Sequence, residues 1–230
     1  MAAPADRREK ILILGGTAEA AAIARRLVDA GADVVTSLAG RTSNPAPLPG
    51  RTRIGGFGGA EGLARYIAEN GIAKVIDATH PFANRISQNA RLACAATGIP
   101  LEQPERPTWK KQPGDNWIDV QSLEEAASAL PAGARAFLAL GRQYLAAFEG
   151  RPDCHFVVRM VDPPEATLGL AGYDLILGKP SADPHEEAEL FRTHRVTHLV
   201  CRNSGGDAGY GKIAAARSLE LPVIMVRRAT

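Results

Sequence analysis

The chain has 230 residues, of which 45% are hydrophobic, and a formal net charge of +2 at pH 7. This size and composition can supply the core of one large domain or of two small ones, and the small net charge excludes a basic nucleic-acid-binding coat while leaving room for a local anion site. The three cysteines, Cys94, Cys154 and Cys201, are too widely spaced for a disulfide framework, a zinc site or an iron–sulfur cluster.

The N-terminal segment has the features of neither a signal peptide nor a membrane span. It begins MAAPADRREK, which is charged, and continues into an apolar run of only four residues. No later segment reaches membrane-spanning length. We therefore expect a cytoplasmic protein that binds neither a membrane nor nucleic acid.

The stretch ILILGGTAEAAAIARRL, residues 11–27, predicts a strand, a tight turn and a helix. Two glycines allow the backbone to approach a phosphate closely, and the positive end of a helix dipole favours an anion at the same place. The fingerprint G-x-G-x-x-G is incomplete, because Ala20 stands where a third glycine is expected. The stretch is therefore either a variant nucleotide site or a coincidental match. As a nucleotide site it would use Gly15, Gly16, Thr17, Ala18 and Glu19.

The next predicted strand, ADVVTSLAG, ends in groups that suit a phosphate. An acidic residue at this end would bind the ribose of NAD, but Asp33 begins the strand and belongs to the opposite edge of the sheet. Ser37, Arg41 and Thr42 lie near the correct end, and arginine donates a fixed fork of hydrogen bonds to phosphate. We therefore expect NADP(H) rather than NAD(H). The alternative is that Arg41 is a solvated loop residue.

A helix over residues 60–70, a strand ending near Asp77 and a helix that stops at Gly98 come next. The motif DATHPFA follows that strand, at the sheet edge where open α/β sheets bind ligands. His80 is the candidate catalytic residue, since an imidazole there could donate a hydrogen bond or a proton. Thr79 and Pro81 are predicted to contact the cofactor. The alternative is that Thr79 or His80 caps a helix starting near Phe82.

Residues 100–117 contain four prolines and a glycine, and we place the linker here. The alternation of strand and helix then resumes with WIDV, SLEEAASAL, RAFLAL, HFVVRMV, YDLIL, PHEEAELFRTH, THLVC, KIAAARSL and PVIMV. Such alternation predicts mainly parallel sheets. We predict an α/β protein of two Rossmann-like domains, residues 1–112 for the nucleotide and 113–230 for the substrate, with the active site in the interdomain cleft.

The segment GGDAGYGKI has the glycine and lysine spacing of a P-loop, but Ile213 replaces the hydroxyl residue that would hold Mg²⁺. Phosphoryl transfer is therefore not expected, and an anion-binding loop remains. Its predicted donors are Asn203, Ser204, Gly205, Gly206 and Lys212. No histidines have the spacing of a metal site, so no metal is expected.

Further basic residues fall in or beside the predicted loops and could together bind a polyanionic substrate. Any one of them could instead be a solvated surface charge. The candidates assigned to the substrate are Arg85, Arg106, Arg142 and Arg159, with Lys212 from the anion-binding loop.

Taken in order, the motifs GGTAEA, SLAGR, DATHPFA, ERPTW, RNSGG and LPVIMVRR resemble the precorrin-6A reductase family of cobalamin biosynthesis. The resemblance covers nearly the whole chain. It implies two Rossmann-like domains and an NADPH-dependent reductase that transfers hydride to a ring carbon of a corrinoid macrocycle, reducing precorrin-6A to precorrin-6B. The macrocycle carries many carboxylates, which fits the basic residues. A cobalt-containing substrate and a non-catalytic NADP-sensing domain remain as alternatives.

We predict that Arg41→Ala weakens NADPH binding by about 1.5–3 kcal/mol, the contribution of a charge-assisted hydrogen bond, and leaves NADH binding nearly unchanged. Titration of each nucleotide measures this difference. Equal weakening of both nucleotides would contradict the assignment of Arg41 to the 2′-phosphate.

Overall fold

The computed structural model describes residues 9–40 and 46–228. The chain divides into two compact units between Glu105 and Arg106. Residues 106–112 thus belong to the second unit of this division. The predicted boundary after residue 112 stays a prediction about the domains.

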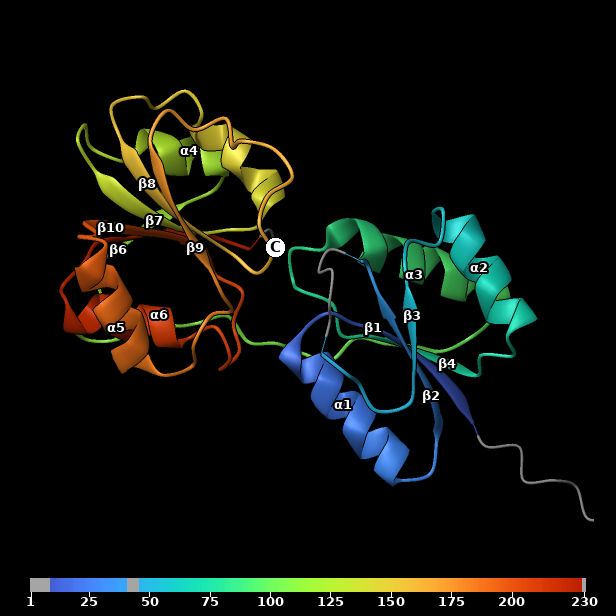
Figure 1. Ribbon diagram of the computed structural model, residues 1–230. Helices are drawn as coiled ribbons and strands as arrows, with labels where there is room; N and C mark the ends of the chain where they lie inside the picture. The colour runs from blue at the N-terminus through green and yellow to red at the C-terminus, as the bar shows by residue number, and fades with distance from the viewer. Residues whose placement is uncertain (1–8, 41–45, 229–230) are drawn as a thin grey trace, which may run out of the picture. The chain divides into compact units, whose positions relative to one another are not determined.

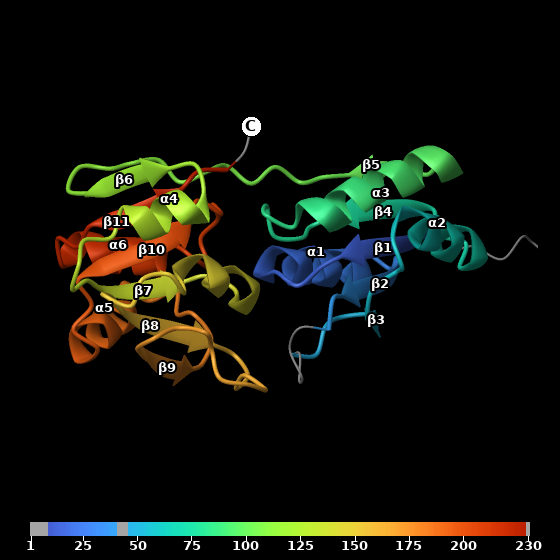
Figure 2. The same ribbon diagram turned by 90° about the horizontal axis from the view of Figure 1, so that it is seen from above.

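The first unit is an α/β unit built on one parallel sheet. Its elements are β1 (Lys10–Leu14), α1 (Ala18–Asp29), β2 (Asp33–Leu38), β3 (Arg51–Ile54), α2 (Ala60–Glu69), β4 (Lys74–Asp77), α3 (Asn84–Thr97) and β5 (Leu101–Glu102). The strand order is β3-β2-β1-β4-β5, as Figure 2 shows, and every pairing is parallel. Helix α1 covers one face of the sheet, whereas α2 and α3 cover the other (Figure 1).

The core of this unit follows from the alternation of side chains along a strand. In β1, Leu12 and Leu14 point toward α2 and α3, and Ile11 and Ile13 point toward α1. Because both faces are covered, the strand is a continuous apolar run rather than an alternating one. This explains why ILIL reads as a buried strand in the sequence.

The second unit is also built on one parallel sheet. Its elements are β6 (Trp117–Val120), α4 (Leu123–Ser128), β7 (Arg135–Ala139), the 3₁₀ helix η1 (Arg142–Phe148), β8 (His155–Met160), β9 (Tyr173–Leu177), α5 (Pro184–Thr193), β10 (His198–Arg202), α6 (Gly211–Ser218) and β11 (Val223–Val226). The strand order is β6-β11-β10-β7-β8-β9, with all pairings parallel (Figure 2). One face packs against α4 and η1 and the other against α5 and α6.

The predicted fold class is confirmed, and three elements were not predicted from the sequence. These are β3, β5 and η1. Strand β3 has only four residues and none of them is fully buried, so it lacks the apolar run of a central strand. The position of Asp33 at the amino-terminal end of β2 is confirmed, where its carboxylate pairs with Arg51 at 2.8 Å.

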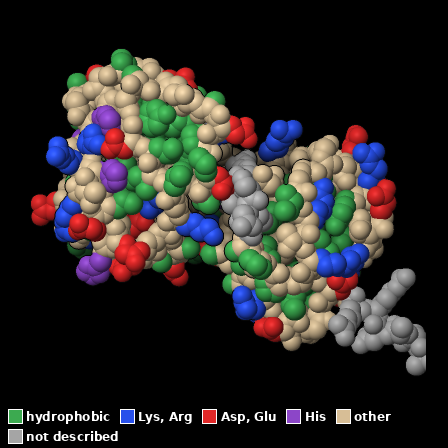
Figure 3. Space-filling view, viewed as in Figure 1, with side chains coloured by type: hydrophobic (Ala, Val, Ile, Leu, Met, Phe, Trp, Pro, Cys, Tyr) green, Lys and Arg blue, Asp and Glu red, His purple; other side chains and the backbone are tan. Residues whose placement is uncertain are grey.

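No helix among the described residues is long and apolar enough to cross a membrane. Acidic and basic side chains are interspersed on the face shown in Figure 3.

A buried ion pair lies in the second unit. The guanidinium of Arg159 donates to both carboxylate oxygens of Glu187, at 2.6 and 3.1 Å, and the two side chains are 8% and 1% exposed. The backbone N–H of Ser181 donates to the same carboxylate at 2.8 Å. The pair therefore links β8 to α5 and to the loop before that helix.

We predict that Glu187→Ala lowers the free energy of unfolding by about 3–5 kcal/mol, because it leaves a buried guanidinium without its partner. Urea unfolding measures this change. The matched control is Glu189→Ala on the same helix, because Glu189 pairs with Arg192 at 3.6 Å on the surface. It should change stability by about 0–1 kcal/mol. Similar losses in both variants would contradict the prediction.

Candidate functional site

The carboxyl-terminal ends of β1 and β4 meet in the first unit at the point where the strand order reverses. Strands β1 to β3 extend the sheet in one direction, and β4 and β5 extend it in the other. Open α/β sheets bind ligands at such a switch point. The turn after β1 carries Gly15, Gly16 and Thr17, and the turn after β4 carries Thr79, His80 and Pro81.

The glycine turn after β1 is tight and leaves its backbone open. The N–H of Gly15 donates to Ser37 O at 2.9 Å, and a Cβ on Gly15 would lie 2.9 Å from Thr36 Cγ2. Gly16 has φ +107, which favours glycine, and no atom of the described residues lies within 4 Å of the position of its missing Cβ. A phosphate could therefore approach the backbone at Gly16.

Thr17 joins the two turns. Its hydroxyl accepts a hydrogen bond from Ala20 N at 3.1 Å, which caps α1, and donates to Ala78 O at 2.8 Å. Ala18 and Glu19 form the first turn of α1. Because N–H groups in the first turn of a helix have no intrahelical acceptor, this end of α1 is suited to an anion.

The buried carboxylate of Asp77 shapes the second turn, a role that the sequence analysis missed. It accepts hydrogen bonds from Thr79 Oγ1 at 2.6 Å, Thr79 N at 3.2 Å and Gln103 Nε2 at 3.0 Å. The signal in the sequence is an aspartate two residues before a threonine, the spacing of an Asx turn. Asp77 therefore fixes Thr79 and holds the residues that follow β5.

His80 closes the turn that precedes α3. Its Nδ1 accepts a hydrogen bond from Phe82 N at 3.3 Å, and its carbonyl accepts one from Ala83 N at 2.7 Å. This places the proton of the neutral ring on Nε2. Helix α3 begins at Asn84, and no side chain in the described part of the chain caps it, so the alternative of a helix capped by Thr79 or His80 near Phe82 is wrong. Half-buried Pro81 lies inside this turn.

Ser37, at the end of β2, has a neighbour that the sequence analysis did not single out. Arg53 Nη1 lies 3.2 Å from Ser37 Oγ, because β3 pairs with β2 and brings these two residues into register. Arg53 was missed because its strand was not predicted. Arg41 and Thr42 lie outside the residues that the structure describes.

In the second unit the predicted anion-binding loop follows β10 and is hydrogen-bonded to Trp109. Asn203 Oδ1 accepts from Trp109 N at 2.8 Å, and its Nδ2 donates to Trp109 O at 2.9 Å. The Trp109 indole donates to Gly206 O at 2.8 Å. The amide of Asn203 therefore holds the loop in place.

The two glycines of this loop are required by its geometry. Gly205 has φ +66, and a Cβ there would lie 2.1 Å from Pro107 O. Gly206 has φ +75. Arg228 donates to Ser204 O at 3.0 Å and to Arg106 O at 2.9 Å, which closes the loop against the start of the second unit.

Lys212 is buried beneath this loop. Its ammonium donates to Gly209 O and lies 4.8 Å from the centroid of the Trp109 ring. Burial lowers the pKa of Lys212, and the nearby Cys201 and Glu187 oppose that shift. One hydrogen bond of the Lys212 ammonium is therefore already used by the protein, at Gly209 O.

The structure brings together only some of the predicted substrate residues. Arg142 is exposed where η1 begins, directly after β7, which is the strand next to β10. The carbonyl of half-buried Arg106 accepts a hydrogen bond from Arg228, which also donates to Ser204 O in the anion-binding loop. Arg159 is bound to Glu187, and Arg85 is exposed on α3 in the first unit. Their binding of a substrate stays a prediction.

Among the residues that the structure describes, no group of three or more His, Cys, Asp or Glu side chains is arranged to hold a metal ion.

Comparison with known proteins identifies the family to which this chain is similar. The family model described as "Precorrin-6x reductase CbiJ/CobK" matches residues 10–230. A precorrin-6A reductase from a Sinorhizobium species is 50% identical over 226 residues, which cover 97% of this chain and 87% of that protein. A cobalt-precorrin-6A reductase from Priestia megaterium is 32% identical over 232 residues, covering 95% of this chain and 90% of that protein. A solved structure titled "CobK precorrin-6A reductase" superimposes with a TM-score of 0.94 at 46% identity, covering 96% of this chain and 89% of that one.

Proposed function

The chain belongs to the precorrin-6A reductase (CbiJ/CobK) family, a family of oxidoreductases in cobalamin biosynthesis, and we propose that it reduces precorrin-6A to precorrin-6B with NADPH in the cytoplasm. The observation that carries the proposal is the near full-length identity of 46–50% to two precorrin-6A reductases. The open glycine turn at the switch point supports a nucleotide donor, because Gly16 leaves space where a side chain would obstruct a phosphate.

In this proposal NADPH binds to the first unit. Gly15, Gly16 and the first turn of α1 hold the pyrophosphate through backbone N–H groups. Thr17 keeps the turn after β4 at a fixed position relative to that helix, since its hydroxyl is bound to Ala78 O. When bound, NADPH supplies the hydride, and the protein supplies alignment and exclusion of water.

In this proposal His80 donates a hydrogen bond to the macrocycle at the site of hydride transfer. Its Nδ1 is already an acceptor for Phe82 N, so protonation of the ring at Nδ1 would break the turn's own hydrogen bond. This favours a neutral imidazole that donates from Nε2. The proton that must balance the hydride on the macrocycle then comes from solvent.

The macrocycle binds to the second unit, where the anion-binding loop and Arg142 are suited to its carboxylates. A metal-free macrocycle is favoured over a cobalt-containing one. Identity to precorrin-6A reductases reaches 50%, whereas the cobalt-precorrin-6A reductase of Priestia megaterium is 32% identical.

The test is NADPH oxidation in the presence of metal-free precorrin-6A. We expect turnover with NADPH, a strong preference over NADH, and slower turnover when the macrocycle contains cobalt. Activity should survive exhaustive chelation, because no metal takes part in the proposed reaction. Nucleotide binding without any macrocycle reduction would instead indicate a non-catalytic NADP-sensing domain.

We predict that His80→Asn lowers kcat about 100-fold, the typical cost of removing a hydrogen-bond donor from a developing charge. Asparagine can still accept from Phe82 N as an Asx turn, so the KM for NADPH should change little. Steady-state kinetics between pH 6 and 8 test this. The parent and the variant should share the shape of the pH profile. If the parent loses activity as the pH rises and the variant lacks that limb, then His80 is the proton donor.

A further inference from the structure

Arg53 occupies a position at the nucleotide edge of the first sheet that no sequence motif marked. It lies opposite Ser37 in the parallel β2–β3 pair, and its Nη1 is 3.2 Å from Ser37 Oγ. In a nucleotide-binding sheet, the end of the second strand lies beside the ribose of the adenosine. The guanidinium of Arg53 therefore lies next to the ribose position expected for a bound dinucleotide.

The guanidinium is held in a fixed orientation. Nη1 also donates to Gly55 O, and Nη2 donates to Gly56 O at 2.7 Å. Its central carbon lies 3.8 Å from the centroid of the Phe57 ring and 5.2 Å from that of Tyr66. An arginine held by carbonyls and stacked on an aromatic ring loses little rotamer freedom when it binds a ligand.

The charge of Arg53 is not balanced by a carboxylate among the described residues. Its hydrogen-bond acceptors there are one hydroxyl and two carbonyls, all neutral. By contrast, Arg51 pairs with Asp33 at 2.8 Å. The three bonds of Arg53 also leave Nε–H and a second Nη2–H without an acceptor in the described part of the chain. These two N–H groups form a fork that matches two phosphate oxygens.

We propose that Arg53 binds the 2′-phosphate of NADPH and sets the preference of this enzyme for NADPH over NADH. This inference rests on the proposed function, which makes NADPH the hydride donor. Ser37 and the carbonyls of Gly55 and Gly56 position the guanidinium, and the Nε–Nη2 edge receives the phosphate. A purely structural Arg53 would only support the loop from Gly55 to Phe57.

The test is the equilibrium binding of NADPH and NADH to full-length protein, measured by nucleotide fluorescence without macrocycle. Arg53→Ala should weaken NADPH binding about 10- to 100-fold and change NADH binding less than about twofold. Arg53→Lys should give an intermediate loss, since it keeps the charge but not the fork. Thermal unfolding of each variant shows whether the fold is kept.

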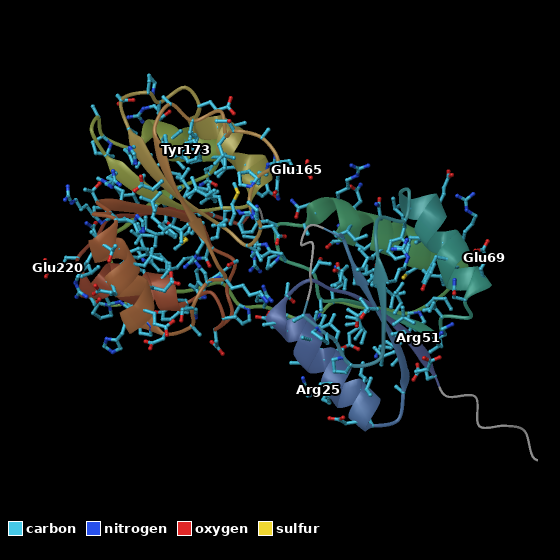
Figure 4. All side chains as sticks on the ribbon, in the orientation of Figure 1. Arg25, Arg51, Glu69, Glu165, Tyr173 and Glu220 are labelled. Carbon is cyan, nitrogen blue, oxygen red and sulfur yellow. The ribbon has the colours of Figure 1, made fainter. Side chains whose placement is uncertain are left out.

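The matched control is Arg51→Ala, which removes the same charge from the first residue of the same strand (Figure 4 labels Arg51). The ratio of the two affinities should stay at the parent value in this control. An equal loss for both nucleotides, or no loss for either, in folded Arg53 variants would overturn the inference. A parent protein that binds both nucleotides equally would contradict the proposed NADPH preference itself, and the inference with it.

Discussion

The parallel pairing of β1 with β4 is the constraint on which the proposed nucleotide site depends. Their register pairs Leu14 with Asp77, so the two following turns leave the sheet at the same level. At this level the Thr17 hydroxyl donates to Ala78 O while it accepts from Ala20 N and caps α1. One hydroxyl thus couples the helix end that suits an anion to the turn that carries His80. The position of the candidate catalytic ring relative to the glycine turn is a consequence of strand register.

The anion-binding loop of the second unit also lies at the carboxyl-terminal edge of its own sheet, but different contacts fix its conformation. Here no side chain of the described residues caps α6, and the loop before it is fastened to Trp109 through both polar groups of the Asn203 amide. Gly205 must be a glycine because the carbonyl of Pro107 occupies the space of a Cβ. The loop conformation therefore depends on a segment that lies about one hundred residues earlier in the chain.

Position in the fold divides the basic residues into two kinds. Arg159 and Lys212 are buried and bound to groups of the protein, Glu187 and Gly209 O. Burying a cation is costly unless it is paired, so the first role of such residues is to stabilise the fold. Arg53 and Arg142 lie at the carboxyl-terminal edges of their sheets, where Arg53 is half-buried and Arg142 is exposed, and neither pairs with a carboxylate among the described residues. Counting basic residues in loops, as sequence analysis must, does not separate these kinds.

The sequence by itself determined the alternation of strands and helices, the glycine turn after β1, the switch-point turn with His80 and the amino-terminal position of Asp33. These features depend on local periodicity and on residues adjacent in the chain. Only the tertiary structure decided that Arg53 lies beside Ser37 and that Asn203 binds Trp109. Such contacts depend on strand order and register, which join residues far apart in the sequence. A short strand such as β3 has no fully buried residue, so no local pattern revealed which neighbour it would join.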